Sequence, residues 1–108
     1  MPPRTAQHKT LTKRLEDTMT FLERHGEFHW VQWLRLTTQH LDDGEARAGA
    51  QVLRAFAAPG SFDDLVISAD GGHDVSPGDE ARANRRLAEL RDAVREEAAR
   101  LSRRPRHV

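Results

Sequence analysis

The sequence contains no cysteine and no tyrosine. Without cysteine the chain can form neither a disulfide nor a thiolate zinc site, and a reducing cytoplasm is its natural compartment. Without tyrosine, acid–base chemistry by a phenol is excluded. The sequence also lacks the roughly 7–15 consecutive apolar residues of a signal peptide and the roughly 20 of a membrane span. We therefore expect a soluble, cytoplasmic protein.

Catalytic motifs are scarce as well. The segment 59–61 lacks the lysine of a phosphate-binding loop, and no serine stands in a G-x-S-x-G elbow. His25 and His29 have the spacing of two helical metal ligands, but Gly26 is expected to break the helix between them and a third ligand is missing. The leading interpretation therefore includes no catalytic residue, no metal ligand and no cofactor.

The 108 residues match the usual size of one domain, and the charges along them are segregated. The net charge is zero overall, but it is +2 over residues 1–41, −7 over residues 42–80 and +5 over residues 81–108. The two end segments can neutralise the acidic middle within the fold, or the acidic middle can form a face that meets a basic partner. Arginine outnumbers lysine by 15 to 2, a usage typical of GC-rich bacterial genomes.

Apolar spacing predicts four amphipathic helices, at about 11–25, 27–41, 45–57 and 77–102. Thr10 is a plausible N-cap for the first helix, and Gly26 is the left-handed residue expected after its end. The fourth helix has a stronger start signal, with Ser76 as N-cap, Pro77 in the first turn and Asp79 completing an acidic capping box. Its inner stripe comprises Ala83, Leu87, Leu90, Val94, Ala98 and Leu101.

The second predicted helix is the most apolar. Trp30, Leu34 and Leu41 lie on one stripe, so we expect this helix to form the centre of the fold. Phe28 and Leu36 point elsewhere, towards either a second part of the core or another chain. Both possibilities stay open at the level of the sequence.

Residues 61–68 hold one short apolar run, Leu65–Ile67, with no second strand to pair with it. We favour a short turn that plugs the bundle over an edge strand that pairs with another chain. The sequence thus predicts an all-α fold, a compact four-helix domain over residues 9–102 with an irregular or extended segment near residues 61–68 packed on the helices. We expect residues 1–8 to be a disordered tail and residues 103–108 a basic one.

The same segment supplies the candidate partner-binding residues, which are Ser61, Phe62, Asp63 and Asp64. The pattern suggests an exposed aromatic ring among acids, although Ser61 and Asp64 also fit a structural capping box. With no catalytic motif, the leading hypothesis is a non-enzymatic protein-binding module, either an immunity or a regulatory protein. We expect a monomer or homodimer with a protein partner.

Two alternatives belong to other classes. The first is a nucleic-acid-binding protein that uses Arg95, Arg100, Arg103, Arg104 and Arg106. No aromatic residue interleaves these arginines, and a salt-bridged solvated face is the simpler interpretation. The second is a metal-dependent hydrolase at Asp63, Asp64, Asp70, His73 and Asp74. These residues lack the spacing of a calcium loop, and glycine with aspartate is the composition of an ordinary turn.

Four short motifs also carry a resemblance. They are Trp30-Val31-Gln32-Trp33-Leu34, Asp42-Asp43-Gly44, Leu53-Arg54-Ala55-Phe56 and Gly60-Ser61-Phe62-Asp63-Asp64-Leu65-Val66-Ile67. Over most of residues 10–101 the chain resembles a family of short uncharacterised bacterial domains with a W-x-x-W-L helix and a G-S-F/L-N/D-D-L-V segment. Residues 57–60 depart from the Gly-Gly-Met-Gly turn typical of that family. The resemblance implies a self-contained bacterial domain and no particular reaction.

Overall fold

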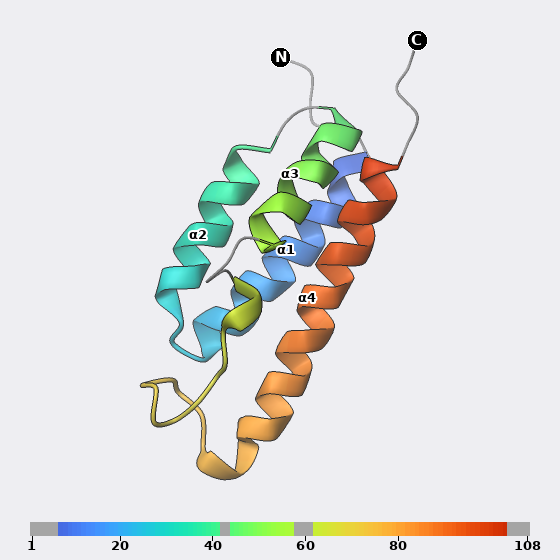
Figure 1. The fold of residues 1–108 in the computed structure, drawn as a ribbon. Coiled ribbons are helices and arrows are strands. Elements are labelled where there is room, and N and C mark those ends of the chain that lie inside the picture. The colour runs from blue at the N-terminus through green and yellow to red at the C-terminus, as the bar shows by residue number, and fades with distance from the viewer. Residues whose placement is uncertain (1–6, 42–43, 58–61, 104–108) are drawn as a thin grey trace.

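A computed structural model describes residues 7–41, 44–57 and 62–103. Within these ranges the chain is all-helical and compact, with no strand, as the sequence predicted (Figure 1). The four α-helices are α1 (Gln7–Arg24), α2 (Phe28–Gln39), α3 (Glu45–Ala57) and α4 (Glu80–Ser102). Two short 3₁₀ turns, η1 (Phe62–Asp64) and η2 (Pro77–Asp79), lie between α3 and α4.

The ends of α1 show where sequence signals for helix boundaries succeed and fail. Gly26 has φ of +73° and follows the end of α1, as predicted. The predicted N-cap at Thr10 is wrong, because α1 already begins at Gln7, inside the expected tail. Leu11 is the first buried residue of the stripe, so it marks where packing begins rather than where the helical hydrogen bonds begin.

The start of α4 also differs from its prediction. Pro77–Asp79 forms the 3₁₀ turn η2, and the α-helix begins only at Glu80. Neither Ser76 nor Asp79 makes a side-chain capping bond, so the predicted capping box is wrong. The Asp79 N–H instead donates to the backbone oxygen of Ser76 at 2.8 Å, which satisfies the group that the serine hydroxyl was expected to cap.

The longest helix, α4, is the centre of the fold. It packs on α3 and on α1, and α1 in turn packs on α2 (Figure 1). The prediction that residues 27–41 form the central helix is therefore wrong. The physical reason is length, since α4 spans 23 residues and buries its predicted stripe from one end to the other. The buried residues are Ala83, Leu87, Leu90, Val94, Ala98 and Leu101, all as predicted.

The segment before α4 closes the bundle next to α2 and α3. Phe62 in η1 is fully buried, with its ring centroid 5.4 Å from that of Trp30, 6.0 Å from that of Trp33 and 5.4 Å from that of Phe56. Ile67 is also fully buried. The predicted plug is therefore confirmed, although its helical turn lies at η1 rather than at 65–67.

Candidate functional site

The irregular segment is held to α4 by side chains. The Asn84 amide donates to Ile67 O at 2.8 Å, and its oxygen accepts from Ile67 N–H at 2.7 Å. One turn earlier, the Glu80 carboxylate accepts from Ala69 N–H at 2.7 Å. A neighbouring strand would make the same kind of contacts with an extended backbone. Asn84 and Glu80 therefore supply hydrogen-bond partners to the backbone of this segment, as a neighbouring strand would.

Arg91 completes the attachment of η1 to α4. Its guanidinium donates to Phe62 O at 2.8 Å and to Leu65 O at 3.3 Å, and its Cζ lies 5.6 Å from the centroid of the Phe62 ring. Burial lowers the pKa of Arg91 below its usual value. These contacts fix the backbone of the plug, so we interpret Arg91 as a structural residue.

His73 and Glu27 join the loop to the start of α2. The Ser68 N–H donates to His73 Nδ1 at 3.0 Å, so the proton of the neutral ring is on Nε2, which donates to Glu27 Oε1 at 2.9 Å. The other Glu27 oxygen accepts from Trp30 N–H at 3.1 Å and caps α2. Because both ring nitrogens are occupied, His73 has no lone pair available for general-base catalysis.

The residues proposed for a metal-dependent hydrolase do not form a site. Asp63 pairs with Arg95 at 2.5 Å, while Asp64, Asp70 and Asp74 are exposed. Among residues 7–41, 44–57 and 62–103, no group of three His, Asp or Glu side chains could hold a metal ion. The geometry therefore gives this alternative no support.

The structure also changes the interpretation of the predicted partner-binding segment, Ser61–Asp64. The expectation that Phe62 is exposed is wrong, because its ring fills the gap between α2 and α3. Asp63 and Asp64 are exposed, and Ser61 lies outside the described residues. The burial of the aromatic ring leaves this segment with only polar groups to offer a partner, and its role in binding stays a prediction.

Three of the arginines proposed for nucleic-acid binding lie in the described part of the chain, and two of these three pair with acids. Arg95 bonds Asp92 at 2.6 Å as well as Asp63, and Arg100 bonds Glu97. Burial by itself lowers the pKa of Arg95, but the hydrogen bonds to Asp92 and Asp63 outweigh it and raise that pKa. Arg103 is exposed at the end of α4, and Arg104 and Arg106 lie outside the described residues. The paired arginines favour the salt-bridged face that the sequence suggested.

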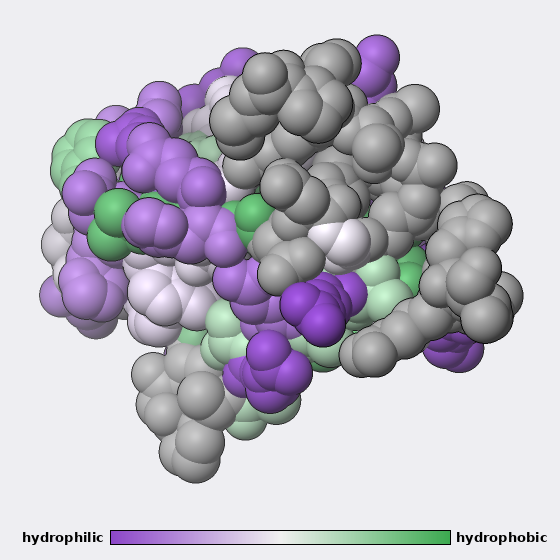
Figure 2. Space-filling view, turned by 90° about the horizontal axis from the view of Figure 1, so that it is seen from above, coloured by the Kyte–Doolittle hydropathy of each residue, from purple (hydrophilic) through white to green (hydrophobic). Residues whose placement is uncertain are grey.

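An apolar surface that the sequence left unassigned lies on the outer face of α2. Phe28 is 66% exposed and Leu36 is 45% exposed, and the two are eight residues apart on one helix. Gln32, exposed between them, completes what we call the α2 outer face. Seen from above, the described surface has small hydrophobic patches among hydrophilic ones, and some of these patches lie on the left, the side on which α2 lies (Figure 2). The off-stripe positions of Phe28 and Leu36 were the signal for this surface.

Fold and site together define a small all-helical domain whose helices clamp an irregular segment and whose second helix presents an apolar outer face. The chain belongs to the DUF6966 family, a domain of unknown function whose sequence model matches residues 23–76, half of the chain. No curated protein and no solved structure matches it. None of the described helices combines the length and the apolar character needed to cross a bilayer.

This match confirms the coarser part of the predicted resemblance. The expected family is an uncharacterised one, and the matched range contains both the tryptophan motif of α2 and the segment around η1. The bacterial origin and the particular family motifs stay predictions.

Proposed function

We propose that this domain is a non-enzymatic protein-binding module and that the α2 outer face is its interface. The observation that carries the proposal is the exposure of Phe28 and Leu36 on one side of a helix whose other side is packed. Large apolar side chains grouped on an exposed surface are typical of interaction sites. The proposal moves the interface from the Ser61–Asp64 segment, whose aromatic ring is buried, to α2.

The charge distribution supports the same surface. Residues 28–39 contain one formally charged side chain, Arg35, although 31% of the whole chain is charged. Arg35 lies seven positions after Phe28, and therefore on the same side of α2, where it pairs with Glu23 of α1 at 3.5 Å. The centres of protein interfaces are depleted of charge and enriched in aromatic residues, and the α2 outer face has Phe28 and no charged member, whereas Trp30 and Trp33 pack against the core.

The spacing of Phe28 and Leu36 along α2 indicates the shape of the partner's surface. Phe28 and Leu36 are separated by two helical turns, or about 12 Å along the axis. We expect the partner to be a different protein with an uncharged apolar groove that accepts both side chains, the mode in which an amphipathic helix lies in a groove. A bacterial immunity or regulatory protein would use such an interface without catalysing a reaction.

The test compares the wild-type chain with the Phe28→Ala/Leu36→Ala variant. Each is used as bait in cells of the source organism with crosslinking, and each captured protein is then purified and titrated against the bait. We expect the double variant to bind the purified partner at least about tenfold more weakly. Arg14→Ala/Glu16→Ala changes exposed side chains of α1 and is the matched control.

Three results would contradict the proposal. The first is a purified partner that binds the double variant and the wild type equally. The second is an equal loss of binding in the α1 control, which would place the interface elsewhere. The third is a concentration-dependent dimer in analytical ultracentrifugation that the double variant abolishes, because α2 would then bind a second copy of this chain.

A further inference from the structure

The loop between η1 and η2 is closed on the ring of His73. The Ile67–Ser68 peptide group lies between two side chains, because its oxygen accepts from the Asn84 amide at 2.8 Å and its N–H donates to His73 Nδ1 at 3.0 Å. The other ring nitrogen donates to Glu27 Oε1 at 2.9 Å. The side chains of His73 and Glu27 are only 10% and 15% exposed. The ring therefore links the segment clamped on α4 to the start of α2.

This arrangement requires a neutral ring. An imidazolium carries a hydrogen on both nitrogens, so its Nδ1–H and the Ser68 N–H would be two donors facing each other with no acceptor between them. Asn84 holds the oxygen of the peptide group, and Glu27 holds Nε2 of the ring. Neither the peptide group nor the ring can therefore turn to relieve the conflict without losing a second hydrogen bond.

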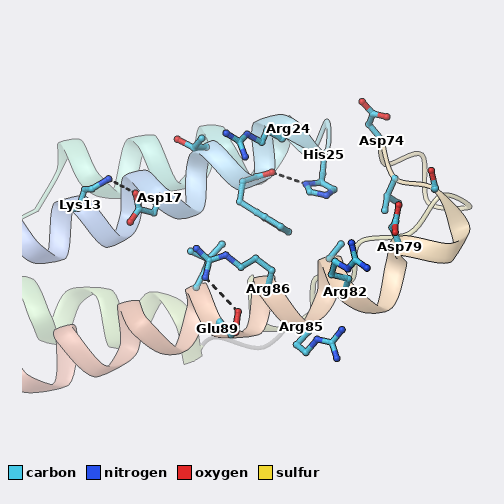
Figure 3. A pocket seen from close by; sticks show the side chains of 16 residues that line it. Lys13, Asp17, Arg24, His25, Asp74, Asp79, Arg82, Arg85, Arg86 and Glu89 are labelled. Atoms are coloured by element: carbon cyan, nitrogen blue, oxygen red, sulfur yellow. Dashed lines mark hydrogen bonds and ion pairs between the residues drawn. The ribbon is translucent and has the colours of Figure 1, made fainter.

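The charges around the loop compensate a positive ring. Glu27 pairs with the ring directly, and Glu80 at the start of α4 accepts from the Ala69 N–H at 2.7 Å. The other titratable side chains at this end of the bundle, most of them labelled in Figure 3, are Arg24, His25, Asp70, Asp74, Asp79 and Arg82. Acids outnumber cations in this set, so the cost of protonating His73 falls on its contact with Ser68.

The middle of the loop has the freedom to move. Gly71 and Gly72 are adjacent, and Gly72 has φ of +89°. A Cβ at Gly72 would meet no described atom within 4 Å, so no side chain blocks a change of backbone conformation there. The far end is anchored, because the Asp74 N–H donates to His25 O at 2.9 Å. Movement is therefore confined to residues 70–73.

We propose that His73 is a pH-sensitive latch on this loop. In its neutral form the ring holds residues 70–73 against the Ile67–Ser68 peptide group. When the ring takes up a proton, it stays bound to Glu27 and separates from the Ser68 N–H, which then bonds water. Histidine is the side chain that ordinarily changes charge between about pH 5 and 8, so the latch responds in the physiological range. No residue of the α2 outer face takes part, so the latch does not depend on the proposed interface.

The experiment follows the full isotope-labelled chain by NMR from about pH 8 to about pH 5. Ring nitrogen shifts report the charge of His73, and amide exchange, expressed as protection relative to an unstructured chain at the same pH, reports the hydrogen bond of Ser68. We expect the protection of Ser68 to fall at least about tenfold as the ring of His73 is protonated. The Trp30 N–H, which Glu27 caps, should keep its protection.

His73→Asn is the matched variant, because its side-chain oxygen can accept from the Ser68 N–H without taking up a proton. The protection of Ser68 in this variant should not change with pH. His29→Asn removes an exposed histidine of α2 and should leave the transition at Ser68 as it is in the wild type.

The proposal is overturned if His73 stays neutral throughout this pH range, or if its ring is protonated while Ser68 keeps its protection. Both results come from the wild-type chain and need no variant to fold. A transition at Ser68 that persists in His73→Asn would assign it to another titrating group and would also overturn the proposal. So would a parallel loss of protection at Trp30, because the ring would then have released Glu27.

Discussion

At the scale of single residues, Asn84 shows how one side chain can replace a secondary-structure element. Its amide gives Ile67 both an acceptor and a donor, and it also donates to Glu80 O at 2.9 Å within α4. A buried backbone group that loses its partner costs the full desolvation of that group. The irregular segment can therefore remain packed without any neighbouring strand.

We predict that Asn84→Leu destabilises the fold by about 2–4 kcal/mol, because it leaves both polar groups of Ile67 without partners. Denaturant unfolding measures this change. Asn84→Asp is the matched variant, since it keeps the acceptor for Ile67 N–H but loses the donors to Ile67 O and Glu80 O. A loss of stability below about 0.5 kcal/mol for Asn84→Leu would show that water replaces the amide.

Gly49 is the residue that sets the distance between α3 and α4. A Cβ at this position would lie 2.3 Å from Ala98 O and 2.8 Å from Ser102 N. Alanine normally stabilises a helix relative to glycine by about 1 kcal/mol. Here the contact is with backbone atoms, so it can be relieved only if the two helices separate.

Gly49→Ala is therefore expected to lower the free energy of unfolding, by roughly 1–3 kcal/mol, in spite of the gain in helix propensity. Thermal and denaturant melts will measure the sign. Gly78→Ala is the control, because a Cβ at Gly78 meets no atom within 4 Å and its φ is negative. A stabilising Gly49→Ala would mean that α3 and α4 are further apart than described.

At the scale of elements, the two sides of α2 differ in what they do. Val31 and Leu34 are buried, whereas Phe28 and Leu36 are exposed on the outer face. The helix contributes to the fold with one side and leaves the other for the proposed partner. Stability and binding should accordingly be separable within this one helix.

We expect Leu34→Ala to cost about 2–5 kcal/mol of stability, the usual loss for a buried leucine. Phe28→Ala should change the free energy of unfolding by less than about 0.5 kcal/mol, because its ring is mostly in water. Chemical denaturation of the two variants side by side tests the contrast. A large loss for Phe28→Ala would assign this ring to the core and remove the basis of the proposed interface.

At the scale of the whole molecule, the family match and the packed core have different extents. The match covers residues 23–76, but α1 supplies Leu11 and Leu15 to the core and α4 supplies the longest buried stripe. The helices of the matched range therefore pack against two helices that lie largely or wholly outside it. Cooperative folding should require all four.

A fragment of residues 23–76 is accordingly expected to show little helix by circular dichroism and no cooperative melt. The fragment 7–103 should unfold in a single transition, as small single domains do. Cooperative unfolding of the shorter fragment would show that α2, α3 and the clamped segment form a unit without α1 and α4.

Much of this architecture followed from local patterns. The α4 stripe, the stop at Gly26 and the all-α class were predictable, because spacing and backbone freedom act within a few residues. The start of α4 was predicted less well. The pattern of Ser76, Pro77 and Asp79 is compatible both with a 3₁₀ turn and with the capped first turn of an α-helix. The clamp by Asn84 on Ile67 was out of reach, because the two residues are 17 positions apart and no pattern links them.

The sequence by itself determined that this chain forms four amphipathic helices and carries no recognisable catalytic motif. Tertiary structure decided which helix is central, that Phe62 is buried, and that Phe28 and Leu36 face outward. The physical reason is that periodicity defines which side of a helix is apolar, whereas the exposure of any one side chain depends on what packs against that side. Since helices with similar stripes can be arranged in several ways, only their lengths and close contacts, such as that at Gly49, select one arrangement.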